Sequence, residues 1–270
     1  MAPPMPPATF LAALKAEGVT VVEVGSWRTH NRNSKGAWGP VNGVMIHHTV
    51  TSGSARTVEI CRNGYSGLPG PLCHGVITKD GRVHLVGYGR ANHAGSGDDD
   101  VLAAVIAEKK LPAANDANTD GNARFYGFEC ENLGDGKDPW PAAQLDAIER
   151  VSAAICRVHG WDAASVIGHL EWQPGKVDPR GFTMASMRDR IERRLSAPPG
   201  KTPIPSPEKE KPMSYRDVWE KDAAPAPDSS PTKKSNPTWK PISFLREIYD
   251  LARETRDLVR DIRDQQKKGA

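Results

Sequence analysis

Apolar and polar residues along the first 195 positions follow two periods, which together predict a mixed set of strands and helices. Short β-branched or apolar runs predict strands over 19–24, 43–49, 125–131 and 165–168, and a hairpin over 73–86. Apolar residues spaced three and four apart predict helices over 8–17, 56–62, 101–110, 141–159 and 183–195. Because strands alternate with helices, we expect an α/β fold in which helices flank a mixed central β-sheet.

The pattern changes from Ala197 onward. Eleven of the 23 prolines lie between Pro198 and Pro241, among Lys, Glu, Ser and Ala, and this composition is typical of a linker without a core. Spacings of three and four then return and predict an amphipathic helix over 242–268, which either self-associates as a short coiled coil or docks elsewhere. We therefore expect a folded domain over 1–196, a linker over 197–241 and a C-terminal helix.

Charge and composition exclude several classes of protein. Residues 197–270 hold 15 of the 36 basic and 12 of the 33 acidic residues, which leaves 21 of each sign before them. A neutral first domain argues against nucleic-acid binding. No apolar run approaches the roughly 18 residues of a membrane span. Residues 1–7 lack the charged and apolar regions of a signal peptide, so we expect synthesis in the cytoplasm and four reduced cysteines.

The stretch 167–178 carries the densest chemistry of the chain. It contains an imidazole at His169, a cation at Lys176 and a carboxylate at Asp178. Pro174 and Gly175 disfavour a helix across the gap, so we expect a loop. Because His and Asp both bind zinc, such a loop can bring His169 and Asp178 to one metal ion, with a third ligand from elsewhere.

Two predicted strands carry polar residues that require either a hydrogen-bond partner or contact with water. His47 and His48 end the strand 43–49, and alternation places them on opposite faces, so only one of them easily joins a given site. Glu129 and Glu131 share one face of the strand 125–131. They are either solvated glutamates of an edge strand, or one of them is a catalytic carboxylate that faces a cleft.

Five short motifs occur in an order that resembles a known family. They are Ile46-His-His-Thr49, His74 six residues before Asp80-Gly81, His93-Ala-Gly95, Gly127-Phe-Glu129, and His169 followed by Lys176-Val-Asp178-Pro179. Together they resemble the type-2 N-acetylmuramoyl-L-alanine amidases, which include zinc endolysins of phages, peptidoglycan recognition proteins and bacterial anhydromuropeptide amidases. The resemblance covers residues 40–195, and the run 68–74 is most similar to lysins of phages that infect actinobacteria.

The resemblance implies a role for each of five residues. It implies a zinc ion bound by His47, His169 and Asp178, with the fourth position open to water. It implies that Glu129 takes the proton of this water and passes it to the leaving amine. Finally, it implies that Lys176 faces the oxygen on which negative charge develops.

Further residues are implied as substrate contacts. They are His74 and His93, which could otherwise be histidines satisfied within a loop or strand. Trp172 lies near the expected cleft and either stacks on a sugar or packs in the core. Two departures from the family pattern stand out. Some relatives carry a tyrosine beside the zinc where this chain has Cys73, which strengthens Glu129 as the base. The gap before the Lys-Val-Asp motif is one residue shorter, and we expect the loop to absorb the difference.

The resemblance implies an enzyme that acts on peptidoglycan, and we expect a phage or prophage endolysin that lyses its host by cutting the amide between N-acetylmuramic acid and L-alanine. Three alternatives are a non-catalytic peptidoglycan receptor, a cytoplasmic enzyme of wall recycling and a virion structural protein with a vestigial domain. The complete ligand set, through Asp178, argues against the receptor and the structural protein. The tail argues against the recycling enzyme, because a small soluble substrate needs no tether.

Overall fold

A computed structural model describes residues 2–201, 224–225, 234 and 238–268 of the chain. The chain divides into two units, 1–204 and 205–270, which are described separately. The helices of the first unit are α1 (Pro7–Ala16), α2 (Ser54–Asn63), α3 (Asp99–Ile106), α4 (Ala142–His159), α5 (His169–Trp172) and α6 (Met184–Leu195). Three short 3-10 helices cover Asn33–Lys35, Gly121–Ala123 and Ala163–Ser165.

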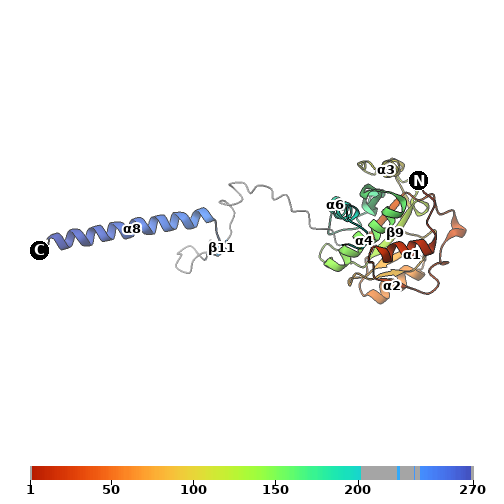
Figure 1. The fold of residues 1–270 in the computed structure, drawn as a ribbon, viewed down its shortest axis with the longest axis horizontal. Coiled ribbons are helices and arrows are strands. Elements are labelled where there is room, and N and C mark those ends of the chain that lie inside the picture. Colours follow the sequence, from red (N-terminus) through yellow and green to blue (C-terminus); the bar gives the residue numbers. More distant parts are fainter. Residues whose placement is uncertain (1, 202–223, 226–233, 235–237, 269–270) are drawn as a thin grey trace. The chain divides into compact units, whose positions relative to one another are not determined.

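A six-stranded sheet in the order β1-β6-β5-β9-β2-β10 forms the centre of the first unit (Figure 1). Its strands are β1 (Val21–Glu23), β2 (Gly43–His48), β5 (Gly75–Ile77), β6 (Val83–Leu85), β9 (Phe125–Cys130) and β10 (Val166–Gly168). All neighbours are parallel except β5 and β6, which form the predicted hairpin. The expected mixed sheet flanked by helices is therefore confirmed. Two small antiparallel pairs were not predicted: β3 (Gly64–Tyr65) with β4 (Leu68–Pro69), and β7 (Ser96–Gly97) with β8 (Thr119–Asp120).

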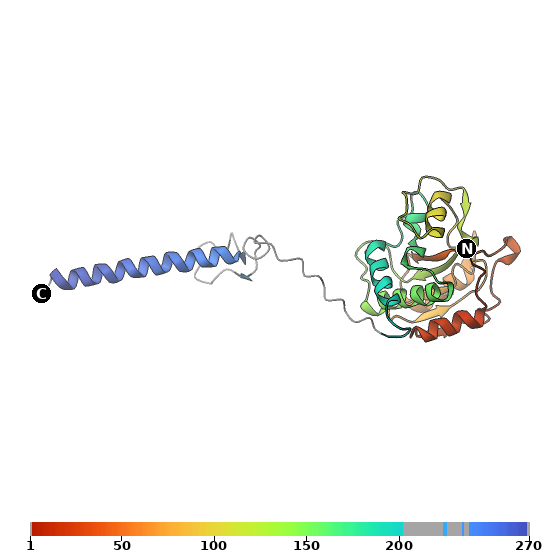
Figure 2. The same ribbon diagram turned by 45° about the horizontal axis from the view of Figure 1, so that its top comes forward.

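One face of the sheet is fully covered by helices. Side chains from α1, α4 and α6 form a large apolar core against Ile46 and Phe128, which point to this face from β2 and β9. Figures 1 and 2 show α1 and α4 side by side, as their contacts require. The helix α4 ends at Gly160, which adopts the left-handed conformation (φ 68°) that glycine tolerates at the end of a helix.

The other face of the sheet is covered in two separate patches. Near β10 and α3, Met45, Val105 and Trp172 belong to one apolar cluster. On the other side, Cys61 of α2 packs with Val76 of β5 in a second cluster. Because the two clusters do not join, the strip of sheet between them, formed by the ends of β2 and β9, is left for polar side chains.

Two local expectations are corrected by the fold. The residues after His169 begin with the one-turn helix α5, because the Glu171 carboxylate accepts a hydrogen bond from Gly168 N and Leu170 N bonds to Asp178 O. Pro174 and Gly175 exclude a helix only beyond this turn. The strand β9 lies between β5 and β2 rather than at an edge, so the interpretation of its glutamates as solvated edge residues is wrong.

In the second unit, a long helix, α8 (Pro241–Lys268), follows a small pair of strands, β11 (Ala224–Pro225) and β12 (Thr238–Trp239). It matches the helix predicted over 242–268. Most of the expected linker over 197–241 lies outside the described residues. Among the residues that are described, no helix is long and apolar enough to cross a membrane.

Candidate active site and metal centre

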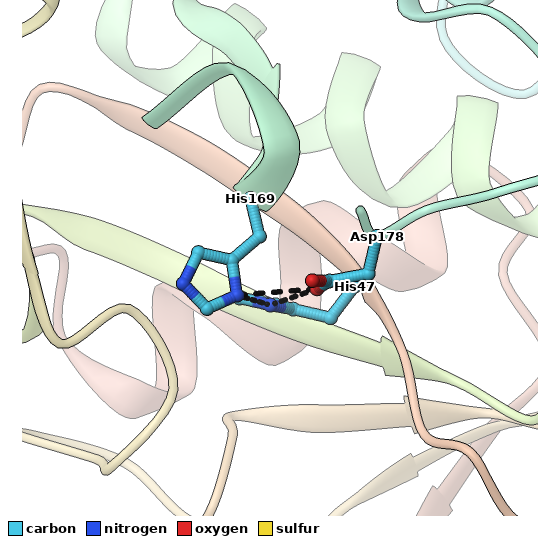
Figure 3. Close-up of side chains that lie close together, drawn as sticks. All are labelled: His47, His169 and Asp178. Atoms are coloured by element: carbon cyan, nitrogen blue, oxygen red, sulfur yellow. Dashed lines mark hydrogen bonds and ion pairs between the residues drawn. The ribbon is translucent and has the colours of Figure 1, made fainter. Parts of the chain in front are cut away.

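Three side chains from separate parts of the chain meet at the carboxyl ends of the central strands (Figure 3). His47 ends β2, His169 follows β10 at the start of α5, and Asp178 lies at the end of the next loop. His47 Nδ1 lies 3.1 Å from His169 Nδ1 and 3.1 Å from Asp178 Oδ2, and His169 Nδ1 lies 3.1 Å from the same oxygen. The three predicted metal ligands are thus brought together by the fold.

The protonation states of His47 and Asp178 suit a metal site. His47 is 1% exposed, and burial lowers the pKa of its imidazole to about 4, against the opposing hydrogen bond to Asp178. The ring is therefore neutral at pH 7, as a metal ligand must be. For Asp178, burial opposes ionisation, but hydrogen bonds from His169 and His47 hold the pKa of its carboxyl well below its usual range.

The three side chains would be able to hold a zinc ion between them. Zinc bonds to nitrogen and oxygen of about 2.0–2.2 Å place neighbouring ligand atoms roughly 3.3–3.5 Å apart, close to the observed triangle. Both Nδ1 atoms also point at the same carboxylate oxygen and at each other. A cation shared by the three atoms would give each of them a partner at once.

The neighbouring residues show why His47, rather than His48, belongs to this group. His48 points to the opposite face of β2, where its Nδ1 accepts a hydrogen bond from Arg180 N at 3.1 Å. His47 Nε2 lies 3.2 Å from His93 Nδ1, so His93 contacts the ring of the ligand from behind. Such outer partners fix the orientation of a metal-binding imidazole.

Glu129 lies directly beside His47, because the two residues are paired in the parallel register of β2 and β9. Its Oε2 is buried and, within the described part of the chain, makes no hydrogen bond. Burial and the charge of Asp178 raise the pKa of this carboxyl to about 8, although Lys176 lowers it. A carboxyl with a pKa near neutrality is suited to accept and return a proton.

Glu131, on the same face two residues later, has a different environment. It is 4% exposed, and its carboxylate accepts hydrogen bonds from Gly53 N, Ser54 Oγ and Lys79 N. These contacts tie the end of β9 to the start of α2 and to the hairpin turn. Both oxygens of Glu131 thus form hydrogen bonds that hold the fold together, whereas Oε2 of Glu129 has no hydrogen-bond partner among the described residues.

A cavity of about 630 Å³ opens over this group. The three ligand residues, Glu129, His93 and Lys176 line its polar side. Among the described residues Lys176 makes no ion pair, so its ammonium remains available to a ligand. Apolar residues that the sequence did not single out line the rest of the cavity: Val50, Tyr65, Leu68, Leu72 and Val177. No periodic pattern marks these residues, because they lie on loops and on the two-residue strands β3 and β4.

Two of the implied substrate contacts are corrected by the structure. Both ring nitrogens of His74 are occupied, since Nδ1 accepts from Gly127 N at 2.9 Å and Nε2 lies 2.8 Å from Gly89 O. The ring is fully buried against Trp38, so His74 braces the sheet instead. Trp172 is also fully buried, packs on Phe125 and donates its indole N–H to Ala94 O, so it is a core residue.

Comparison with known proteins defines the class to which this site belongs. A profile of the family described as N-acetylmuramoyl-L-alanine amidase (Amidase_2) matches residues 37–181, which is more than half of the chain. The chain therefore belongs to this family and is a peptidoglycan amidase. The match includes the His47, Glu129, His169 and Asp178 positions. No curated protein matches the chain.

Several solved structures are similar in fold. The endolysin amidase LysCS from Clostridium intestinale URNW is 18% identical, with a TM-score of 0.41, and the match covers 63% of this chain and 94% of that one. The catalytic domain of XlyA is 17% identical, with a TM-score of 0.43 and coverages of 64% and 99%. The hydrolase AmiA of Staphylococcus aureus, in complex with its ligand, is 13% identical, with a TM-score of 0.43 and coverages of 72% and 93%.

Proposed function

We propose that this amidase is a zinc-dependent endolysin of a phage or prophage of actinobacteria, and that it cuts the bond between N-acetylmuramic acid and L-alanine in the host wall. The observation that carries the proposal is the triangle of ligand atoms from His47, His169 and Asp178, with edges of 3.1 Å, beside the buried carboxyl of Glu129. Two imidazoles and a carboxylate form a donor set typical of catalytic zinc.

The residues around the triangle supply the remaining steps of amide hydrolysis. Bound zinc would polarise the scissile carbonyl and lower the pKa of a water molecule. Glu129 takes a proton from the attacking water while the water oxygen bonds to the carbonyl carbon. Glu129 then gives this proton to the amide nitrogen as the C–N bond breaks. Lys176 stabilises the negative charge that develops on the carbonyl oxygen. The products are the muramyl carboxylic acid and the free amine of L-alanine.

His93 supports this chemistry from the far side of His47. Its Nδ1 lies 3.2 Å from His47 Nε2, and burial, followed by the neighbouring imidazoles, holds the pKa of His93 well below its usual value. A neutral His93 therefore orients the ring of His47 without adding positive charge beside the metal site. His93 also lines the cavity, so we propose contact with the substrate as its second role.

The alternatives receive less support from the described residues. A receptor that only binds peptidoglycan has no need of a complete ligand set beside a carboxyl with a pKa near 8. The same argument disfavours a virion structural protein with a vestigial first domain. An enzyme of cytoplasmic wall recycling acts on small soluble fragments, for which the helix α8 has no evident use.

Metal and product analyses test the proposal together. We expect purified protein to contain about one zinc ion per chain, and chelation to abolish the release of peptides with a new N-terminal alanine from actinobacterial wall. H47Q should lose both zinc and activity. H48Q is the matched control and should keep both, because His48 faces away from the triangle. Loss of zinc in H48Q but not in H47Q contradicts the ligand assignment.

A second comparison separates an endolysin from a recycling enzyme. We expect the full-length chain to release stem peptides from intact wall at least as fast as from soluble anhydromuropeptides at equal bond concentration, because a tethered enzyme gains from an immobilised substrate. A strong preference for the soluble fragments, with little action on wall, indicates the recycling enzyme instead.

A further inference from the structure

The helix α8 contains a seven-residue repeat that occurs three times without interruption: Phe244–Asp250, Leu251–Asp257 and Leu258–Asp264. Each repeat reads apolar, apolar, Arg, acidic, Ile or Thr, Tyr or Arg, Asp. A repeat of seven is the period of a left-handed coiled coil, in which each helix presents the same stripe along its whole length. The repeat therefore encodes one continuous surface along the helix.

That surface is apolar, and it is exposed. The first, second and fifth positions of the repeat carry the large apolar residues, which share one side of the helix. Six of these side chains are between 48% and 61% exposed: Leu245, Ile248, Leu251, Leu258, Val259 and Ile262. A helix of 28 residues cannot bury such a stripe by itself.

The charges divide the remaining surface into two stripes of opposite sign. On one flank of the apolar stripe lie the sixth and third positions of the repeat. They are basic in every repeat except at Tyr249, as Arg253 and Arg256 illustrate. On the other flank, the fourth position is always acidic, as in Glu247 and Glu254, and the seventh is always Asp. The apolar stripe thus has a positive border on one side and a negative border on the other.

We propose that α8 associates with α8 of a second copy of this chain, as a parallel coiled coil. When two identical helices run in parallel about a twofold axis, the positive border of each faces the negative border of the other. In an antiparallel pair, positive would face positive and negative would face negative. In a parallel pair in register, the small residues Ala252 and Thr255 of one helix also face the same residues of the other. The middle repeat then forms a layer of small side chains between two layers of large ones.

The size of the stripe is sufficient for a stable contact. Burying a Leu, Ile or Val side chain removes roughly 60–120 Å² from water. Six such side chains per helix give roughly 500 Å² per copy and about 1,000 Å² in total, near the lower limit for specific interfaces. The three repeats span about 32 Å of helix, which is enough for three heptads of contact.

A parallel pair would join two catalytic units to one particle at the same end of the coil. Each unit then holds the other near the wall after one has bound, which raises the effective concentration of the free unit. This consequence rests on the proposed action on wall, whereas the association itself does not. A monomeric chain therefore overturns the inference alone, and an associated chain without wall activity overturns only the proposed function.

Light scattering on the full-length chain tests the association. We expect at least twice the chain mass of 29.3 kDa, and the chain mass for I248D/I262D, which places charge in the apolar stripe. D250N is the matched control, because the seventh position faces away from the stripe, and it should keep the wild-type mass. A wild-type mass of one chain, or an unchanged mass in I248D/I262D, overturns the inference.

Two further experiments test the partner and its direction. R256E/R263E and E247R/E254R should each be monomeric, because like charges then meet across the pair, and their mixture should associate again. For direction, K240C places a thiol just before the helix. Two such thiols are adjacent in a parallel pair and about 40 Å apart in an antiparallel one, so mild air oxidation should link K240C chains through a disulfide. Linking no greater than in K240C/I248D/I262D refutes the parallel direction.

Discussion

The buried carboxyl of Glu129 links the chemistry of the site to the stability of the protein, and replacement by glutamine should reveal both. In the metal-free chain, burial and the charge of Asp178 raise the pKa of Glu129 from 4.5 to about 8. The folded state therefore keeps a proton that the unfolded state releases between these two values. The contribution of Glu129 to stability is therefore greatest below pH 4.5 and is lost as the pH rises toward 8. E129Q lacks this titration.

The magnitude follows from the size of the shift. At pH 7 the unfolded carboxyl is 2.5 pH units above its pKa while the folded one is still mostly protonated, which corresponds to about 3 kcal/mol at ~1.4 kcal/mol per unit. Glu129 as a whole is only partly buried, so solvent reduces this value. We expect E129Q to gain roughly 1–2 kcal/mol over the metal-free wild type between pH 5 and pH 7.

The same variant should lose turnover without losing the metal. A general acid–base group contributes about 100- to 10,000-fold, so kcat should fall by that factor while zinc content and KM change little. The assays are urea unfolding of the metal-free proteins at several pH values and release of stem peptides by the metal-loaded ones. E131Q is the control: its hydrogen bonds to α2 predict a loss of stability with turnover largely kept. Parallel stability profiles for wild type and E129Q, or near-normal turnover in E129Q, refute the assignment.

Three further predictions concern residues outside the proton transfer. Burial lowers the pKa of His74 to about 4, so wild-type stability should fall as the pH drops from 6.5 toward 4, and urea midpoints of H74Q should show a weaker dependence in that range. W172F should lower the free energy of unfolding by about 1–3 kcal/mol in thermal denaturation, yet leave KM for soluble muropeptide unchanged, because Trp172 is a core residue. Truncation after Lys201, which keeps the contact of Arg157 with Ala197, should preserve zinc binding and cleavage of soluble muropeptide but slow the clearing of intact wall in a turbidity assay.

The sequence was sufficient to predict the elements that position the site. Short apolar runs located β2 and β9, and the alternation of side chains along a strand was enough to place His47 and His48 on opposite faces. Glu129 on β9 could also be singled out as a possible functional residue, because a glutamate on an otherwise apolar strand requires an explanation. What the sequence could not supply is that β2 and β9 are neighbours, since strand order depends on contacts between residues more than 80 positions apart.

The corrected residues share a physical cause. His74 and Trp172 lie within or near family motifs, and both residue types often contact ligands. Whether such a ring faces a cavity or the core depends on which distant groups reach it: Gly89 and Gly127 for His74, and Ala94 for Trp172. A local pattern contains no information about these partners. The same limit applies to the apolar side of the cavity, which irregular segments contribute.

The hydrogen bond from Leu170 N to Asp178 O, 2.7 Å long, closes the segment between the last two ligands into a ring of its own. His47 and Glu129 are held by the ladder of the sheet, whereas Asp178 is held by this closure. Residues 171–177 can consequently lengthen or shorten during evolution as long as both ends of the ring keep their places. A change of length within the ring would leave both ligands in place, and Val177, which lines the cavity, is a position through which selection can adjust the cavity opening.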